Sequence, residues 1–376
     1  MTDAWIAAPV RTAFTRATKG AFAEARPDDL LAALFRRILA DHPSIRDAVD
    51  DVVVGCAYPE AEQGRNVARA IALSAGLPDR TPAMTLTRMC ASSLEATAIA
   101  CARVRAGDAA LVLVGGVESM TRIPMGGVKP SPNPAWLEQR PDVYIAMGHT
   151  AERVAVRYRI ARADQDAWAV RSHERAAAAR KRGVFAEEIE PVGPVEVDDA
   201  IRPDTSTEKL AKLEPAFDEH GTVTAGNSCP TSDGASALLV ASTEAVERFG
   251  LRPLGRFVSY AVAGVDPALM GVGPVEAVPK ALARAGLTLD DMDRIELNEA
   301  FASQVVAVTR ELGLPVDRLN VNGGALALGH PLGATGARLV GTLLRELARS
   351  GGRHGLATLC VGGGMGAAMI VERTRS

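Results

Sequence analysis

Residues 84–104 read Met84-Thr-Leu-Thr-Arg-Met-Cys90-Ala-Ser-Ser-Leu-Glu-Ala-Thr-Ala-Ile-Ala-Cys101-Ala-Arg-Val104. A short apolar approach reaches a cysteine, and strong helix formers follow with apolar residues spaced for one buried face. The stretch predicts a strand, a sharp turn at Cys90 and a helix. Unpaired N–H groups at a helix start favour negative charge, so we expect a lowered pKa and a nucleophilic thiolate at Cys90. An isolated cysteine of this kind is more often structural, so the rest of the chain has to decide.

The composition is that of an ordinary globular protein. The chain has 376 residues, 47% of them hydrophobic and 23% charged, with a net charge of −3. This charge gives no general attraction to nucleic acid or to an anionic membrane. The number of cysteines is odd (five) and no secretory signal is apparent, so we expect free thiols and a cytoplasmic location. No apolar run reaches the ~20 residues of a membrane span.

The first third of the chain alternates between strand and helix patterns. Strands are expected at 4–9, 51–55 and 109–116, and helices from Pro27 and over 66–75. This alternation predicts an α/β fold with a parallel sheet covered by helices on both faces. Residues 119–149 are rich in proline and residues 184–229 are irregular, with helices expected from Thr150 and from Asp164 between them. A strand returns at 236–241, so we interpret 119–230 as an inserted domain.

The second half repeats the order of the first. A helix at 274–285, a strand at 293–298, a glycine-rich turn with His330, a helix through Leu347 and an apolar strand from 355 follow one another. In the first copy the matching turn carries Cys90, which indicates an internal duplication. We therefore expect one half from 1–118 plus 231–253 and a second half over 254–376. Because sites in such sheets lie at the carboxyl ends of strands, Cys90, His330, Asn298 and Cys360 are expected to meet.

Each of these residues has a simpler interpretation when it is taken alone. Asn298 suits a helix cap, His330 a loop histidine and Cys360 a core position. The glycines around His330 lack the lysine of a phosphate-binding loop. Together, two thiols, a histidine and an amide suit acyl transfer through a thioester. Cys90, at a helix start, suits the nucleophile, and Cys360, with a pKa expected near its usual value, suits an acid/base.

Eight motifs in this order make the chain closely similar to the thiolase family, the acetyl-CoA acyltransferases and acetyltransferases. They are Cys90-Ala-Ser-Ser-Leu, Gly115-Gly-Val-Glu-Ser-Met120, Met147-Gly-His-Thr-Ala-Glu152, Gly221-Thr-Val-Thr-Ala-Gly-Asn227, Gly271-Val-Gly-Pro-Val-Glu276, Asn298-Glu-Ala-Phe-Ala302, Gly329-His-Pro-Leu-Gly-Ala-Thr-Gly-Ala-Arg338 and Cys360-Val-Gly-Gly-Gly-Met-Gly366. The resemblance implies a thiolase fold, in which two duplicated α/β halves pack as an α-β-α-β-α layered sandwich with an inserted loop domain.

The resemblance also implies roles for the residues. Cys90 would carry the acyl group, and His330 would activate it. Asn298 would hold a water of one oxyanion hole, and the backbone N–H groups of Cys90 and Gly362 would form a second one. Cys360 would act as the acid/base in a ping-pong reaction that cleaves a 3-ketoacyl-CoA with CoA, or condenses acyl groups in reverse.

The remaining implications concern CoA and assembly. Residues 119–230 would bind CoA, with contacts at Arg202, Cys229 and Met147. CoA is a substrate, and the resemblance implies no other cofactor and no metal. The partners would be CoA, acyl-CoA and further copies of the chain in a homodimer or homotetramer, with no nucleic acid and no membrane span.

The chain departs from the family pattern at a few positions. Thr87 stands where asparagine is usual and Ser93 where glycine is usual; Cys229 and Lys209 stand where serines are usual. Ala146 replaces a histidine that biosynthetic acetoacetyl-CoA thiolases carry before Met-Gly. We therefore favour a degradative 3-ketoacyl-CoA thiolase over a biosynthetic one.

Three other classes of protein remain as alternatives. A β-ketoacyl synthase would place two histidines beside the cysteine, whereas this chain offers His330 and Cys360. A Cys–His hydrolase has no use for a second thiol. A non-catalytic acyl-CoA-binding homologue stays open because of Thr87 and Ser93.

Overall fold

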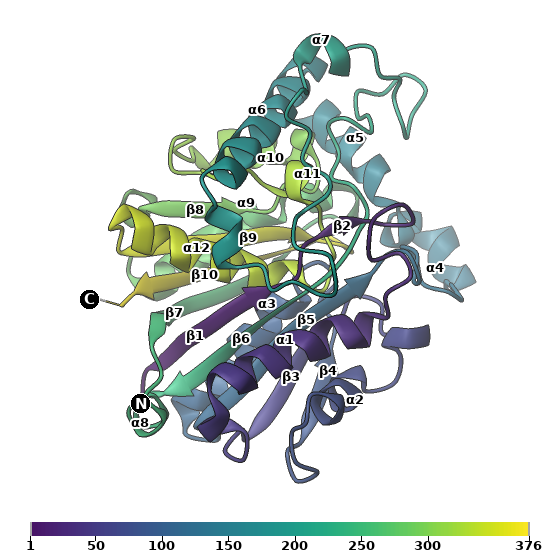
Figure 1. The fold of residues 1–376 in the computed structure, drawn as a ribbon. Coiled ribbons are helices and arrows are strands. Elements are labelled where there is room, and N and C mark those ends of the chain that lie inside the picture. The colour runs from purple at the N-terminus through teal and green to yellow at the C-terminus, as the bar shows by residue number, and fades with distance from the viewer. Residues whose placement is uncertain (1, 375–376) are drawn as a thin grey trace.

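The structure is a computed structural model, and it describes residues 2–374 (Figure 1). These residues form ten strands of one sheet and twelve α-helices. The strands are β1 (Ala4–Arg11), β2 (Thr15–Arg16), β3 (Asp51–Gly55), β4 (Ala83–Leu86), β5 (Leu111–Ser119), β6 (Ser232–Ser242), β7 (Pro253–Gly264), β8 (Arg294–Leu297), β9 (His354–Val361) and β10 (Met365–Arg373). The helices are α1 (Pro27–Asp41), α2 (Val67–Ser74), α3 (Ser92–Ala106), α4 (Pro134–Gln139), α5 (Met147–Arg157), α6 (Arg162–Lys181), α7 (Thr207–Leu210), α8 (Thr243–Phe249), α9 (Gly273–Ala285), α10 (Ala302–Leu312), α11 (Ala325–Leu328) and α12 (Thr335–Ser350).

The sheet is mixed, so the expectation of a purely parallel sheet was wrong. Its strands run in the order β4-β3-β5-β6-β1-β7-β10-β9-β8, with β2 beside β6. Only β3–β4, β3–β5 and β8–β9 pair in parallel. β9 and β10 are joined by three residues, and a link this short permits only an antiparallel pair. β5 and β6 also pair antiparallel, across the long insertion between them.

The element order runs twice along the chain. The first run is β1, α1, β3, α3, β5, β6, and the second is β7, α9, β8, α12, β9, β10. β1 and β7 pair antiparallel and join the two runs in one sheet. In the second run, the place of β4 is marked only by a parallel bridge between Leu319 and Ile295.

Alternating strand residues divide the core into layers. Val53 of β3 faces a central cluster that also contains Leu94 of α3 and Leu343 of α12. Val52 and Val54 face the opposite way, toward an outer cluster that contains α1 and α2. On the other half, α9 and α10 cover the outer side of β8, β9 and β10. α3 and α12 therefore lie between the two halves of the sheet, which gives the expected α-β-α-β-α order.

The chain between β5 and β6 holds α4–α7 and long loops. In Figure 1, α5, α6 and α7 stand outside the strands at the top of the view. The helices expected from Thr150 and Asp164 begin earlier, at Met147 and Arg162. Extended residues (Ala146 and Ala161) precede both helices without a side-chain cap, so cap residue types alone misplaced the starts. Within the described residues, no helix is both long and apolar enough to cross a membrane.

Candidate active site

Cys90 lies on a strained turn between β4 and α3, as the sequence predicted. Met89, directly before it, has a φ of +44°, a conformation that is costly for a side chain with a Cβ. The Thr87 hydroxyl donates to the Ala57 carbonyl at 3.0 Å and accepts from the Met89 amide at 3.2 Å. The Ser92 hydroxyl donates to the Met89 carbonyl at 2.6 Å. Thr87 therefore stabilises the turn with one donated and one accepted hydrogen bond, although the family usually has asparagine at this position.

The pKa expected for Cys90 was wrong in direction. Burial raises the pKa of this thiol to about 11, although the N–H groups of Gly362 and of Cys90 itself act to lower it. The side chain is only 8% exposed and belongs to a buried cluster that also includes residues of α12 and β9 from the second half. The resting thiol is therefore protonated at neutral pH and needs a base to become a nucleophile.

His330 is the candidate base, and its hydrogen bonds fix its tautomer. The Thr335 hydroxyl donates to the Pro331 carbonyl at 2.8 Å, so it accepts from His330 Nδ1 at 2.6 Å. The proton then sits on Nδ1, and Nε2 carries the lone pair. Asn298 Nδ2 lies 3.3 Å from Nε2 and can donate to it. Burial, with a smaller contribution from Arg338, lowers the pKa of His330 to about 3, so the imidazole is neutral.

Asn298 and Cys360 meet at the carboxyl ends of β8 and β9. The Asn298 amide donates to the Thr358 carbonyl at 2.9 Å, two residues before Cys360. Burial raises the pKa of Cys360 well above its usual value, and nearby Cys90 and Cys229 raise it further. The near-normal pKa expected for Cys360 was therefore wrong, because complete burial disfavours the charged thiolate.

Gly362 lies in the three-residue hairpin between β9 and β10. Its neighbours Gly363 and Gly364 have φ values of +84° and +80°, which glycine adopts at little cost. The Gly362 N–H acts on the Cys90 thiol, so the hairpin reaches the nucleophile turn. A Cβ built on Gly362 would lie 3.7 Å from the Met147 sulfur. The structure thus gathers Gly362, Met147 and Cys90 in one place.

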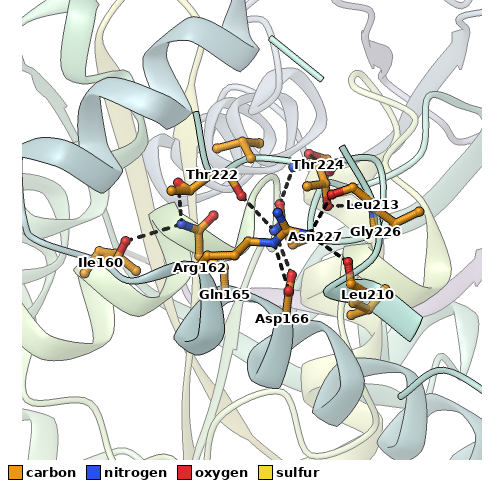
Figure 2. A network of polar contacts seen from close by, with 12 residues as sticks. Ile160, Arg162, Gln165, Asp166, Leu210, Leu213, Thr222, Thr224, Gly226 and Asn227 are labelled. Atoms are coloured by element: carbon orange, nitrogen blue, oxygen red, sulfur yellow. Dashed lines mark hydrogen bonds and ion pairs between the residues drawn. The ribbon is translucent and has the colours of Figure 1, made fainter. Parts of the chain in front are cut away.

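Cys229 reaches the same place on a loop with a dense polar network (Figure 2). Burial, with a smaller contribution from nearby Cys90, raises the pKa of its thiol to about 12. The Cys229 amide donates to the Ala300 carbonyl at 3.0 Å, beside Asn298. Asn227 Nδ2 donates to Asp166 Oδ1 at 2.9 Å, and Arg162 Nε donates to Asp166 Oδ2 at 2.8 Å. This network, drawn in Figure 2, fixes the loop against α6.

Arg202 contacts a different partner. Its amide donates to His173 Nδ1 at 3.1 Å, and its Nη2 lies 3.2 Å from His173 Nε2. Burial lowers the pKa of His173 to about 4, so the ring accepts as a neutral base. Lys209 pairs with Asp204 at 2.6 Å on the surface. Lys209 and Arg202 both lower the pKa of the Asp204 carboxyl, so the two cations lie in one region of the insertion.

Two further residues bear on the site that the sequence analysis did not single out. Thr335 sets the tautomer of His330, and Glu118 accepts hydrogen bonds from the amides of Ala57 and Gly333. Both lie inside the quoted motifs, five residues after His330 and at the end of an apolar strand. A hydroxyl or carboxylate at such a position in the sequence indicates a buried polar contact, but the residue that it contacts can be identified only in the folded structure.

Comparisons with known proteins show the family. Residues 4–244 match the family model of the thiolase N-terminal domain, and residues 251–373 that of the thiolase C-terminal domain. The chain is 47% identical to a 3-ketoacyl-CoA thiolase of Bacillus subtilis, over 99% of this chain and 100% of that protein. It is 46% identical to a β-ketoadipyl-CoA thiolase of Pseudomonas putida, with the same coverage.

A solved structure shows the same fold. Human mitochondrial 3-ketoacyl-CoA thiolase in complex with CoA superposes with a TM-score of 0.91 at 38% identity, covering 100% of this chain and 98% of that one. The expected thiolase fold is therefore confirmed. With both family models matched in order and relatives aligned over nearly their whole length, the chain belongs to the thiolase family.

Proposed function

We propose that this thiolase cleaves a 3-ketoacyl-CoA with CoA, giving acetyl-CoA and a shortened acyl-CoA through an acyl-enzyme on Cys90. The observation that carries the assignment of roles is geometric: the Cys90 sulfur faces the amides of Gly362 and Cys90, and the hydrogen bonds of His330 leave its lone pair on Nε2. His330 takes the thiol proton, and Cys90 Sγ attacks the keto carbonyl. The bond between the α and keto carbons then breaks, and Cys360 protonates the α-carbon of the leaving enolate.

Two sets of donors would hold the oxygens that become negative. The amides of Cys90 and Gly362 face the Cys90 sulfur, which supports an oxyanion hole for the acyl-enzyme. The Asn298 Oδ1 atom is buried and has no protein partner among residues 2–374, so it can accept from a water, as the resemblance implies. CoA then attacks the acyl-enzyme: its thiol proton passes to the Cys360 thiolate, the thioester bond to Cys90 breaks, and protonated His330 returns its proton to the Cys90 sulfur, which completes a ping-pong cycle. We propose no other cofactor and no metal for this sequence of steps.

Mass spectrometry after incubation with acetyl-CoA tests the nucleophile. We expect acetylation of Cys90 alone, its loss in Cys90→Ser, and its retention in Cys101→Ser, which removes a buried thiol from α3, the helix that follows Cys90. Cys360→Ser should still be acetylated but should not complete thiolysis. Acetylation of Cys56 or Cys229 instead of Cys90 would refute the assignment. Loss of acetylation in Cys360→Ser with intact CoA binding would mean that the two thiols have exchanged roles.

We place the nucleotide end of CoA on the insertion, residues 119–230, near Arg202 and Lys209. The two cations share one region, and a guanidinium suits phosphate recognition. Cys229 and Met147 would contact the pantetheine end near Cys90. Arg202→Gln should raise the KM for CoA with little change in kcat, and added salt should reduce the difference between the two proteins. An unchanged KM would remove Arg202 from the site.

The acyl chain of the substrate is the part of the proposal that an assay has to decide. Relatives with two substrate names, 3-ketoacyl-CoA and β-ketoadipyl-CoA, match at 47% and 46% identity. Thiolysis should therefore be compared across straight, branched, ring-bearing and carboxylate-ended 3-ketoacyl chains. A role in fatty-acid β-oxidation requires that straight chains be cleaved best. Preferred formation of acetoacetyl-CoA would instead support the biosynthetic alternative, against which Ala146 argues.

Assembly and location follow as proposals from the same resemblance. We propose a homodimer or homotetramer, and light scattering that shows a monomer would overturn it. Free thiols at all five cysteines suit a reducing compartment such as the cytoplasm.

A further inference from the structure

One buried carboxylate lies between the turn of Cys90 and the turn of His330. Glu118, near the end of β5, is 0% exposed. Its Oε2 accepts from the Ala57 amide at 2.7 Å and from the Gly333 amide at 2.8 Å. Its Oε1 accepts from Gln63 Nε2 at 2.8 Å and from the Tyr58 amide at 3.3 Å. The carboxylate therefore binds one loop from each half of the molecule.

The Ala57 side of this contact leads to the nucleophile. The carbonyl of Ala57 accepts from Thr87, whose hydroxyl holds the amide of Met89. Met89 is the strained residue directly before Cys90. A turn with a positive φ at a methionine persists only where its neighbours hold it. Movement of the Ala57 loop would therefore move Cys90.

The Gly333 side leads to the histidine. Gly333 lies three residues after His330 and shortly before α12 begins at Thr335. The Ser93 hydroxyl of α3, also 0% exposed, accepts from the Ala337 amide in the first turn of α12 at 2.9 Å. The first N–H groups of a helix have no partner within the helix, so this bond caps α12 from the opposite half. A Cβ on Gly336 would lie 2.2 Å from the Leu94 nitrogen, so the two helices touch here.

We propose that Glu118 and Ser93, here called the cross-half tether, are positioning residues that fix His330 relative to Cys90. This inference rests on the proposed roles of Cys90 and His330. The tether acts through the Ala57 loop and the start of α12, and we assign it no contact with substrate. Ser93 stands where the family usually has glycine. Its hydroxyl thus adds a hydrogen bond between the halves that glycine, which has no side chain, could not make.

Glu118→Gln is the first test. The amide keeps one acceptor oxygen but turns N–H donors toward the donors that surround it. We expect kcat for thiolysis to fall about tenfold or more, with the KM for CoA within about twofold, because a misplaced base affects the chemical step. Glu118 also contributes to raising the pKa of Cys90. Removing the Glu118 charge should therefore leave the rate at which iodoacetamide alkylates Cys90 at high pH equal or higher, while kcat for thiolysis falls.

Ser93→Ala is the second test, and it changes no charge. It should lower kcat less than Glu118→Gln does, again with an unchanged KM. If Glu118→Gln does not fold, the kcat of Ser93→Ala decides whether the tether positions His330. Asp51→Asn is the matched control, because it removes a buried carboxylate that accepts from the Val52 amide at the opposite end of β3. It should lower the melting temperature and leave kcat per folded enzyme unchanged.

The outcomes separate the tether from the function on which it rests. In one outcome, the wild-type enzyme is alkylated and acetylated at Cys90, and the variants lose stability but keep their kcat per folded enzyme. This outcome would overturn the tether and leave the proposed roles of Cys90 and His330 intact. Wild-type enzyme that is acetylated elsewhere would overturn the proposed roles. A Glu118→Gln enzyme that melts earlier but keeps its kcat per folded enzyme, as expected for Asp51→Asn, would show that Glu118 acts only through stability.

Discussion

The tautomer of His330 depends on a single hydroxyl. Thr335 accepts from Nδ1 and donates to Pro331, so only Nε2 is left to take a proton. Thr335→Val keeps the shape of the side chain and removes both bonds, whereas Thr335→Ser keeps them. We expect Thr335→Val to lower kcat roughly tenfold or more, as loss of a buried hydrogen bond allows. Steady-state thiolysis assays measure this, and equal activity of the valine and serine variants would contradict it.

The reactivity of Cys90 should depend steeply on pH. Its pKa is raised to about 11, so in the free enzyme the thiolate is the minor form at neutral pH and grows as pH rises. The rate of alkylation by iodoacetamide should therefore increase about tenfold per pH unit between roughly pH 7 and 9. Peptide mapping, with Cys90→Ser to measure background labelling, gives the rate at this one site. A plateau below pH 8 would instead support the lowered pKa that the helix start alone predicts.

At the scale of elements, the loop that carries Cys229 is held by a buried network. The Asn227 side chain accepts from the Thr224 amide and donates to Asp166 and to the Thr222 carbonyl. The Asn227 backbone carbonyl accepts from the Ala302 amide at the start of α10. The loop, α6 and α10 are thus joined through one asparagine, part of which Figure 2 shows. The position of Cys229 beside Cys90 depends on these contacts.

Asn227→Ala should therefore affect both stability and substrate binding. Buried partners lose their bonds, so the free energy of unfolding should fall by about 1–3 kcal/mol. The KM for CoA should rise, because Cys229 is no longer held in place. Asn133→Ala is the control, since Asn133 caps the exposed helix α4 in the same insertion. Urea unfolding and kinetics measure both effects, and an unchanged KM in Asn227→Ala would contradict the link to Cys229.

At the scale of the whole molecule, the sequence predicts local features well and burial poorly. The turn at Cys90, the repeat that places His330 and the helix at 66–75 follow from nearby residues. The pKa of Cys90 does not, because it depends on how the second half covers the turn. β7 was not predicted because its buried positions include Ser259 and two alanines, which give a weak alternation. Ser93 acquires its Ala337 partner, and Glu118 its Gly333 partner, only when the two halves pack.

The insertion is joined to the sheet by a buried ion cluster. Arg11 of β1 donates to both oxygens of Asp198, at 2.7 and 2.9 Å, and to Glu188 at 2.8 Å. The three side chains are 1–4% exposed. Both carboxylates belong to residues 119–230, whereas Arg11 belongs to the first strand. The cluster therefore joins the insertion to the middle of the sheet.

Removing Arg11 should destabilise the protein far more than removing an exposed arginine. Arg11→Leu leaves Asp198 and Glu188 buried without a counter-charge, and breaking such a cluster costs about 3–5 kcal/mol. Arg80→Leu removes an arginine that is 66% exposed and pairs with Asp47, so it should cost less than about 1 kcal/mol. Urea unfolding at neutral pH compares the two. Equal losses would show that the cluster contributes no more than a surface pair, and that other contacts hold the insertion to the sheet.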